Sequence, residues 1–216
     1  MKVIGISGSP IPNSNVDRAV KKVLEATGMD TEFIKLSNYK FEACRACVKC
    51  ASTNVCVLKD DATELVQKVK EADAIVIGGY TPHNSLDGRT KSFIERFYCL
   101  HHQKLLLKGK LGGIVITSAI PQQEPYPPVA EMGVAAVKAA MDGHGIKVIG
   151  DVKIVGDVPC MKCGFGEKYE GSGVKLLYGP DAKIADVGFH SFENQPDALK
   201  AAQDLGERIA KELRKE

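Results

Sequence analysis

The chain opens with MKVIGISGSPIPNSN (1–15), in which an apolar run, KVIGIS (2–7), leads directly into a loop of small residues, SGSPIPNSN (7–15). The next segment, NVDRAVKKVLEATG (15–28), places apolar side chains at helical spacing and closes on a glycine. A buried strand, a glycine-containing turn and an amphipathic helix form the first half of a β–α–β unit. This opening stretch therefore predicts an α/β fold.

The same alternation of strand and helix patterns continues to the end of the chain. We expect strands at 2–7, 31–36, 72–79, 111–118 and 146–156, and helices at 15–28, 61–72, 88–100, 128–145 and 195–216. Strands that alternate with helices pair in parallel through right-handed crossovers. The sequence thus predicts a doubly wound, five-stranded parallel sheet of order 2-1-3-4-5, with ligands bound beyond the carboxyl ends of the strands.

Two segments do not follow the alternation. Residues 39–58 form a cysteine-rich loop after the second strand. Residues 157–195 are rich in glycine, have no clear period, and form an irregular insertion after the fifth strand. The chain has 216 residues, an ordinary size for one domain. We therefore expect residues 1–216 to form a single domain with these two elaborations.

The overall charge and composition exclude several classes of function. The formal net charge is +2, with no basic tract, which argues against nucleic acid and acidic membrane surfaces as partners. No apolar run approaches the length of a membrane span, and MKVIGISGSP lacks the features of a signal peptide. We therefore expect a cytoplasmic protein, whose seven cysteines, an odd number, lie in a reducing compartment.

The first loop has the composition of a phosphate cradle. Its small residues let the backbone curve around an anion, and the following helix adds its free N–H groups. Its side-chain donors are Ser7, Ser9, Ser14 and Asn15. The loop lacks the G-x-G-x-x-G pattern of dinucleotide sites and the GK[ST] of a P-loop, so a mononucleotide such as FMN fits it best. The alternative is an ordinary turn with an N-cap at Ser14 or Asn15.

Four cysteines fall within the thirteen residues CRACVKCASTNVC (44–56), in the pattern C-x2-C-x2-C-x5-C. Clustered thiols in a reducing compartment are more often metal ligands or redox groups than structural disulfides, and x2 spacing lets one turn wrap an iron–sulfur cluster. Three alternatives remain open: a four-cysteine zinc site shared with Cys160 and Cys163, a redox-active dithiol, or plain buried thiols. The four residues of the run are Cys44, Cys47, Cys50 and Cys56.

Three stretches resemble the NADPH-dependent FMN reductases, a family with the flavodoxin-like fold. GSPIPNSN (8–15) resembles their GSPR-x-x-SNT loop, and GGYTPHNSLDGRTKSFIER (78–96) resembles the stretch that lies against the flavin ring. LKGKLGGIVITSA (107–119) resembles the strand before their third flavin loop, so that the matches cover most of residues 1–156 and the last helix. The resemblance implies an FMN site formed by Ser7, Ser9, Pro10, Ser14, Asn15 and Val16, by Thr81, Pro82, His83, Asn84 and Ser85, and by Thr117, Ser118 and Ala119.

The chain departs from that family where the flavin ring lies. Val16 stands where the family has Thr, which removes a phosphate donor, and His83 and Asn84 stand where it has Phe and Gly. His83 is therefore the candidate catalytic residue, able to hydrogen-bond the ring or carry protons. The third loop, IPQQEPYPP (120–128), replaces a glycine-rich one, so we expect access to the ring or binding of a partner to differ.

Within this group, the cysteine run resembles that of the iron–sulfur flavoproteins of anaerobic archaea and bacteria. The resemblance implies a [4Fe–4S] cluster, bound by the four cysteines of the run, that exchanges electrons with FMN. It also implies a ferredoxin-type electron donor and a small-molecule acceptor, such as an oxygen species or a quinone-like compound. Finally, it implies homodimers or homotetramers in which the cluster of one subunit lies near the flavin of its neighbour.

Two other functions remain open on the same scaffold. A cluster-free FMN reductase would take hydride from NAD(P)H, and a zinc-stabilised binding module would hold no flavin. Cys160 and Cys163, in CMKCG (160–164), are candidates for a second metal site, whereas Cys99 lies on an apolar helical face and is expected in the core. Iron, zinc and flavin contents distinguish these functions.

Overall fold

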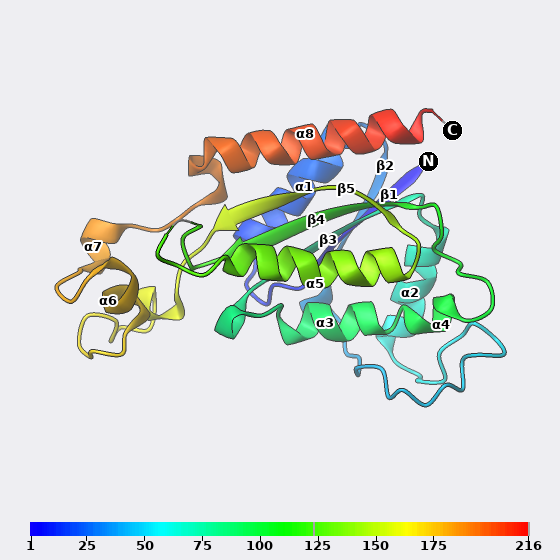
Figure 1. The fold of residues 1–216 in the computed structure, drawn as a ribbon, viewed down its shortest axis with the longest axis horizontal. Helices are drawn as coiled ribbons and strands as arrows, with labels where there is room; N and C mark the ends of the chain where they lie inside the picture. The colour runs from blue at the N-terminus through cyan, green and yellow to red at the C-terminus, as the bar shows by residue number, and fades with distance from the viewer. Residues whose placement is uncertain (123, 216) are drawn as a thin grey trace.

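The computed structural model describes residues 1–122 and 124–215. It contains a five-stranded, all-parallel sheet of order β2-β1-β3-β4-β5, which confirms the predicted topology (Figure 1). The strands are β1 (Lys2–Ser7), β2 (Asp30–Lys35), β3 (Ala74–Tyr80), β4 (Leu111–Ser118) and β5 (Lys147–Val155). The strands β1, β3 and β4 are buried along nearly their whole length, because helices cover both faces of the sheet.

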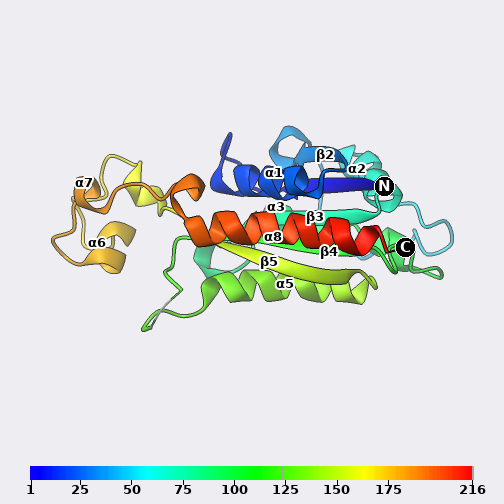
Figure 2. The ribbon, with the colours of Figure 1, turned by 90° about the horizontal axis from the view of Figure 1, so that it is seen from above.

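Helices α1 (Asn15–Thr27) and α8 (Pro196–Leu213) run side by side over one face of the sheet (Figure 2), while α2 (Asp61–Glu71), α3 (Gly88–Glu95) and α5 (Val129–Gly143) cover the other. Ser14 is the N-cap of α1, one of the two positions that the alternative interpretation of the first loop names. Gly28 ends this helix with a φ of 60°, the left-handed conformation that glycine adopts without strain. Within the described ranges, no helix combines the length and apolar content needed to cross a membrane.

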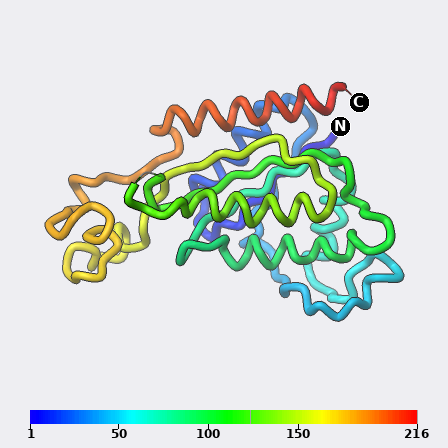
Figure 3. The backbone as a smooth tube through the Cα atoms, viewed as in Figure 1, coloured from blue at the N-terminus to red at the C-terminus, as the bar shows by residue number. Residues whose placement is uncertain are grey.

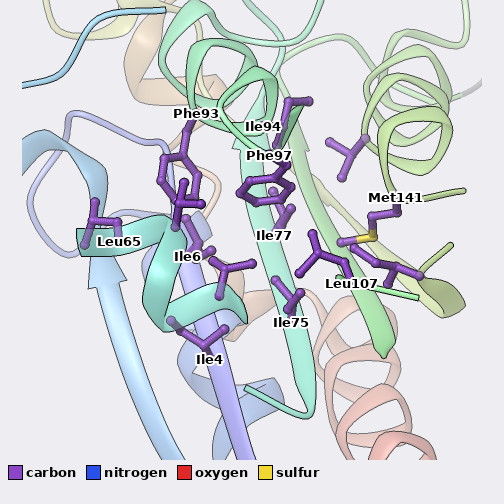
Figure 4. Packing of buried hydrophobic residues seen from close by; sticks show 14 of the residues in the cluster. Ile4, Ile6, Leu65, Ile75, Ile77, Phe93, Ile94, Phe97, Leu107 and Met141 are labelled. Atoms are coloured by element: carbon purple, nitrogen blue, oxygen red, sulfur yellow. The ribbon is translucent and has the colours of Figure 1, made fainter. Parts of the chain in front are cut away.

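The larger of the two buried clusters lies between the sheet and α2, α3 and α5. Isoleucines of β1 and β3, among them Ile6 and Ile77, point toward Phe93 and Phe97 (Figure 4). The two phenylalanine rings pack edge to face with their centroids 5.3 Å apart. This packing holds α3 against the sheet and so fixes the loop that connects β3 to α3.

The predicted helix at 88–100 is wrong in its second half, because the chain forms two helices there. Helix α3 ends at Glu95, and a short α4 (Tyr98–His101) follows. The N–H groups of Arg96 and Phe97 bond to carbonyls three residues back, at 3.0 and 3.1 Å, so the last turn tightens and α3 ends.

The insertion at 157–195 carries two short helices, α6 (Gly173–Tyr178) and α7 (Ile184–Val187), and extends beyond the carboxyl ends of the strands (Figure 3). The loop at 39–58 instead runs toward the amino ends of the strands and lies beside α4. The two irregular segments therefore occupy opposite ends of the molecule. Short 3-10 turns are formed by Leu36–Asn38, Pro82–Asn84, Pro159–Met161 and Phe192–Asn194.

His144, at the end of α5, gives the fold a pH dependence. Its side chain is buried, contacts the rings of Phe97 and His101, and has an Nδ1 with no partner among the described residues. Burial, together with the charge of His101, lowers the pKa of His144 to about 4. Since an unfolded histidine has a pKa of about 6.5, the unfolded chain binds the proton first. The stability that the neutral ring contributes is therefore complete above pH 6.5 and is lost as the pH falls toward 4.

We expect the free energy of unfolding to fall by about 2 kcal/mol between pH 7 and pH 4.5 through this residue alone. The His144→Leu variant removes the titrating group from the same apolar site, so its stability changes less over that range. Guanidinium denaturation of both proteins at the two pH values measures the difference. Equal pH dependence in the two proteins would contradict the assignment to His144.

Candidate flavin and thiol sites

The first loop leaves β1 at the carboxyl edge of the sheet and enters α1 through a capping box. The Ser14 hydroxyl accepts a hydrogen bond from the Asp17 N–H at 3.2 Å, and the Asp17 carboxylate accepts one from the Ser14 N–H at 3.1 Å. Asn13, just before the cap, has a φ of 49° in the left-handed region. The loop thus turns sharply onto the N-terminus of α1, whose first N–H groups and dipole favour an anion.

Several side chains predicted to bind phosphate are engaged within the protein. The Ser7 hydroxyl donates to Asp17 at 2.5 Å, and Val16 is buried in the core. The Asn15 amide donates to the carbonyl of His190 at 2.8 Å and accepts from the N–H of Phe192 at 3.1 Å. Ser9 is buried and Pro10 is exposed. The loop can therefore offer an anion chiefly its backbone N–H groups and the start of α1.

A buried ion pair under this loop was not predicted from the sequence. The Lys35 ammonium, at the end of β2, lies 2.6 Å from the carboxylate of Asp17, whose side chain is 2% exposed. The same ammonium binds the carbonyl oxygens of Ser9 and Ile11 at 2.9 and 2.8 Å. Lys35 thus holds the loop closed and occupies two carbonyls whose negative ends would repel a phosphate.

The second predicted flavin loop, 81–87, is closed by the buried Asp87. Its carboxylate accepts from the Thr90 N–H at 2.8 Å, the Thr90 hydroxyl at 2.7 Å and the Tyr80 N–H at 3.2 Å. Between these anchors, His83 and Asn84 have φ angles of 49° and 59° and are exposed. Two successive left-handed residues outside glycine are uncommon, and they present these side chains at the surface of the loop.

Gly8 packs directly against this anchor. A Cβ on Gly8 would lie 1.8 Å from the Thr90 hydroxyl and 3.1 Å from Asp87. The first and second loops can therefore approach each other only because residue 8 has no side chain. The hydrogen bonds between Thr90 and Asp87 would have to break before residue 8 could carry a side chain.

We expect Gly8→Ala to lose bound FMN and to reduce the free energy of unfolding by about 1–3 kcal/mol, because the new methyl group overpacks the joint between the two loops. Gly88→Ala is the matched control, since a Cβ there meets no atom within 4 Å. Flavin content after gel filtration and chemical denaturation test both variants. Retention of FMN by Gly8→Ala at the wild-type level would show that the joint does not shape the flavin site.

Two threonines supply unsatisfied polar atoms at the same edge. The hydroxyls of Thr81, after β3, and Thr117, at the end of β4, are buried without a partner among the described residues. The two residues are linked by a hydrogen bond from the Thr81 N–H to the Thr117 carbonyl at 3.1 Å. A buried hydroxyl without a partner is costly, so these atoms fit a site that a polar ligand such as a flavin completes.

The other predicted residues of this edge have defined places. Pro82 is half-buried, Ser85 is exposed, and Ala119 is half-buried after β4. The Ser118 hydroxyl accepts from the N–H of Ile120 at 3.2 Å, which starts the third loop. Within that loop, 120–128, residue 123 lies outside the described residues.

Hydrogen bonds from the side chain of Asn54 to backbone carbonyls hold the cysteine loop beside α4. The side-chain amide of Asn54 donates to the carbonyls of Cys99 and His102 at 3.0 and 2.6 Å. Ala46, Val48 and Asn54 have positive φ angles, so the chain between residues 44 and 56 turns repeatedly without forming a helix or strand. A backbone that turns repeatedly in this way can wrap around a compact bound group.

All four cysteines of this loop carry free thiols. Burial raises the pKa of Cys50, and the charges of Cys56, Cys44 and Cys47 raise it further. Cys47 is exposed, while the other three loop thiols are partly buried. Four thiols are the usual ligands of a cubane cluster or a structural zinc. In 1–122 and 124–215, however, no three His, Cys, Asp or Glu side chains surround a common point as metal ligands do.

Cys99 is a buried neighbour of the loop, as predicted. Its side chain is 4% exposed, and burial raises the pKa of the thiol to about 11. Cys160 and Cys163 lie in the insertion at the opposite end of the molecule (Figures 1 and 2). A four-cysteine zinc site formed within one chain by these two residues and the cysteine loop is therefore wrong.

Arg96 joins both ends of the cysteine loop to α3, and sequence reasoning missed it. Its Nη1 donates to the Glu42 carbonyl at 2.9 Å and to Asp60 at 2.7 Å, although its side chain is only 1% exposed. Burial opposes the charge, but Asp60 and the neighbouring Cys56 raise the pKa of Arg96. Its Nε and Nη2 are buried without a partner among the described residues. A buried positive charge with unpaired donors therefore lies near Cys56.

Comparisons with known proteins agree with this arrangement. A family model described as NADPH-dependent FMN reductase matches residues 1–124. An iron–sulfur flavoprotein of Methanocaldococcus jannaschii is 30% identical over 213 residues, which cover 97% of this chain and 96% of that protein. An iron–sulfur flavoprotein of Methanosarcina thermophila is 27% identical over 154 residues, which cover 70% of this chain and 78% of that protein.

Comparison with solved structures gives a flavodoxin-like fold. A solved flavodoxin from the domain Archaea has a TM-score of 0.55 to this structure, covers 99% of both chains, and is 14% identical. At that identity the likeness concerns the fold alone. Together with the sequence matches, it shows that the chain belongs to the iron–sulfur flavoprotein family, within the flavodoxin-like NADPH-dependent FMN reductases, and is a flavin-dependent oxidoreductase.

Proposed function

We propose that this protein carries electrons between a [4Fe–4S] cluster held by the cysteine loop and an FMN bound at the carboxyl edge of the sheet. The observation that carries the proposal is the grouping of four cysteines, Cys44, Cys47, Cys50 and Cys56, at C-x2-C-x2-C-x5-C spacing on one irregular loop. The names of the relatives support it. When bound, the two groups supply one-electron and two-electron chemistry, respectively.

The protein's own residues hold and orient the flavin. The start of α1 and the backbone of the first loop would bind its phosphate, with Lys35 and Asp17 keeping the loop closed. The buried hydroxyls of Thr81 and Thr117 would donate to the flavin, and the loop from Pro82 to Ser85 would flank its ring. In this arrangement His83 is the side chain that can exchange a proton with the ring.

The positions of the two sites support an oligomeric form. In one chain the cysteine loop lies beside α4, away from the carboxyl edge where the first and second loops meet. Electron transfer between cluster and flavin would then run between subunits of a homodimer or homotetramer. A ferredoxin-type protein is the proposed donor, and a small molecule that reaches the flavin is the proposed acceptor.

The test is the iron, sulfide, zinc and flavin content of protein purified without oxygen. We expect about four irons per chain and one FMN. Cys50→Ser should lose most of the iron and keep the FMN, because its side chain lies in the cysteine loop and not at the carboxyl edge. Cys163→Ser, at the opposite end of the molecule, is the control and should keep both. Zinc in place of iron, or iron retained in full by Cys50→Ser, would refute the assignment.

A second candidate function is a cluster-free reductase that takes hydride from NAD(P)H. The match of residues 1–124 to the NADPH-dependent FMN reductases favours it. Anaerobic addition of NADPH distinguishes the two, since a nicotinamide-dependent enzyme bleaches its flavin within seconds even in the iron-free Cys50→Ser variant. An electron carrier that depends on a ferredoxin-type donor leaves the flavin of that variant oxidised.

A further inference from the structure

The proposed electron transfer does not use Cys160 and Cys163. These two residues lie in and just after a hydrogen-bonded turn of the insertion. The 3-10 turn Pro159–Met161 is closed by hydrogen bonds from Met161 to Val158 and from Lys162 to Pro159, each 3.0 Å long. Cys163 lies two residues beyond this turn, and its thiol donates back to the Cys160 carbonyl at 3.4 Å, which directs the Cys163 side chain toward Cys160.

Cys160 has two polar partners aimed at its sulfur. The Tyr169 hydroxyl lies 3.1 Å from the Cys160 Sγ, and the Gly173 N–H donates to the same atom at 3.3 Å. Hydrogen bonds to sulfur favour the thiolate, and the bond from Tyr169 is the main cause that lowers the pKa of Cys160. Cys163 is exposed, while Cys160 is partly buried. The pair thus combines a stabilised thiolate with an accessible second thiol.

The surrounding chain is packed so as to hold this pair. A Cβ on Gly166 would lie 2.2 Å from the Cys160 carbonyl oxygen, so the segment folds back onto the turn only because residue 166 is glycine. Met161 and Val174 are buried beneath it, and Ser172, at the start of α6, is completely buried. The segment that carries the two thiols is therefore packed against the rest of the insertion.

A metal is a poorer explanation of this pair. Two thiols are too few for a closed zinc site, which takes four ligands. Across the described ranges, no third His, Cys, Asp or Glu joins them in an arrangement that could hold a metal ion. The hydrogen bonds from Tyr169 and Gly173 also already satisfy the Cys160 sulfur.

We propose that Cys160 and Cys163 form a redox-active dithiol that reduces low-molecular-weight disulfides, at a site separate from the cysteine loop. The Cys160 thiolate attacks one sulfur of R–S–S–R, forms a mixed disulfide and releases one RS⁻, which takes up a proton. Cys163 then loses its proton to solvent and attacks the Cys160 sulfur, which forms the Cys160–Cys163 disulfide and releases the second RS⁻. Two electrons pass from the dithiol to the external disulfide. A small disulfide is the expected substrate because Tyr169 and the backbone of Gly173 already lie against the attacking sulfur.

The experiment treats the anaerobically purified holoprotein with cystamine and maps every cysteine by peptide mass spectrometry over time. In the wild type we expect the peptide that contains both residues to lose two hydrogens while two thiols are released. In Cys163→Ser the mixed disulfide should persist on Cys160, and in Cys160→Ser the remaining thiol should react about tenfold more slowly. Tyr169→Phe should slow the reaction at Cys160 several-fold without changing FMN content.

Cys163 in the Cys160→Ser variant, an exposed thiol at the same site, is the reference for an ordinary surface thiol. The proposal is overturned if Cys160 reacts no faster than this reference thiol under the same conditions, or if both residues of the wild type keep separate mixed disulfides. Zinc that copurifies with the protein and protects both residues would overturn it in favour of a metal site. Circular dichroism and FMN content confirm that each serine variant is folded.

Discussion

Asp17→Ala is expected to release FMN and to lower the free energy of unfolding by about 3–5 kcal/mol, the usual result of removing one partner from a buried ion pair. The substitution leaves the Lys35 ammonium, whose side chain is 13% exposed, without its counter-charge. It also removes the acceptor of the Ser7 hydroxyl and of the Ser14 N–H. The first loop would then lose its attachment to α1 at the point where we propose that the flavin phosphate binds.

Denaturation of the flavin-free forms of both proteins measures the stability change, because bound FMN itself adds stability to the folded state. Glu25→Ala on the same helix is the control. Its pairing with Lys22 at 3.5 Å is exposed, so its loss should change stability by less than about 1 kcal/mol and leave FMN bound. Full FMN occupancy in Asp17→Ala would contradict the role of this pair in shaping the loop.

The double variant Asp17→Ala/Lys35→Met separates stability from binding. Replacing both buried charges with apolar groups is often close to neutral for stability, so part of the lost free energy should return. FMN affinity should stay low, because the carbonyls of Ser9 and Ile11 no longer have their ammonium donor. Recovery of affinity together with stability would mean that the pair supports the fold and not the site.

The alternation of apolar runs and amphipathic segments was sufficient to predict the sheet order, and the composition of the first loop offered Ser14 as one of two N-cap positions. Hydrophobic periodicity likewise placed Cys99 in the core. The two ion pairs at the sites could not be predicted in this way. Lys35 lies 18 residues from Asp17, and Arg96 lies 36 residues from Asp60, so each pair exists only after strands and helices have packed.

Long-range contacts also changed what local composition had suggested at the first loop. Asn15 has the side chain of a phosphate donor, yet its amide bonds to His190 and Phe192 in the insertion, 175 and 177 residues away. The insertion lies outside the stretches whose motifs resemble the FMN reductases, so no motif indicated this contact. The helix predicted at 88–100 failed for a similar reason. Its apolar spacing continues past residue 95, but the backbone turns where Arg96 reaches the cysteine loop.

Arg96→Met is expected to free the cysteine loop from α3. The variant leaves Asp60 in a partly buried site without its cation and leaves the Glu42 carbonyl without its donor, which should cost about 3–5 kcal/mol of stability. Because Glu42 and Asp60 flank the loop, its two ends would then depend on the hydrogen bonds between Lys40 and Asp61 and on the one from the Glu42 N–H to Asp60. Limited proteolysis should then cleave between residues 42 and 60 at least several-fold faster than in the wild type.

The control is Arg45→Ala, which removes an ion pair with Glu42 from the same loop. Both partners of that pair are more than half exposed, so its loss should change stability by less than about 1 kcal/mol and leave proteolysis unchanged. Iron content is the decisive measurement, since a loop that binds the cluster must keep its thiols together. If Arg96→Met lost stability but kept its iron and its resistance to protease, Arg96 would serve only to pack α3. If iron and resistance fell together, the buried guanidinium would be what positions the thiols for the cluster.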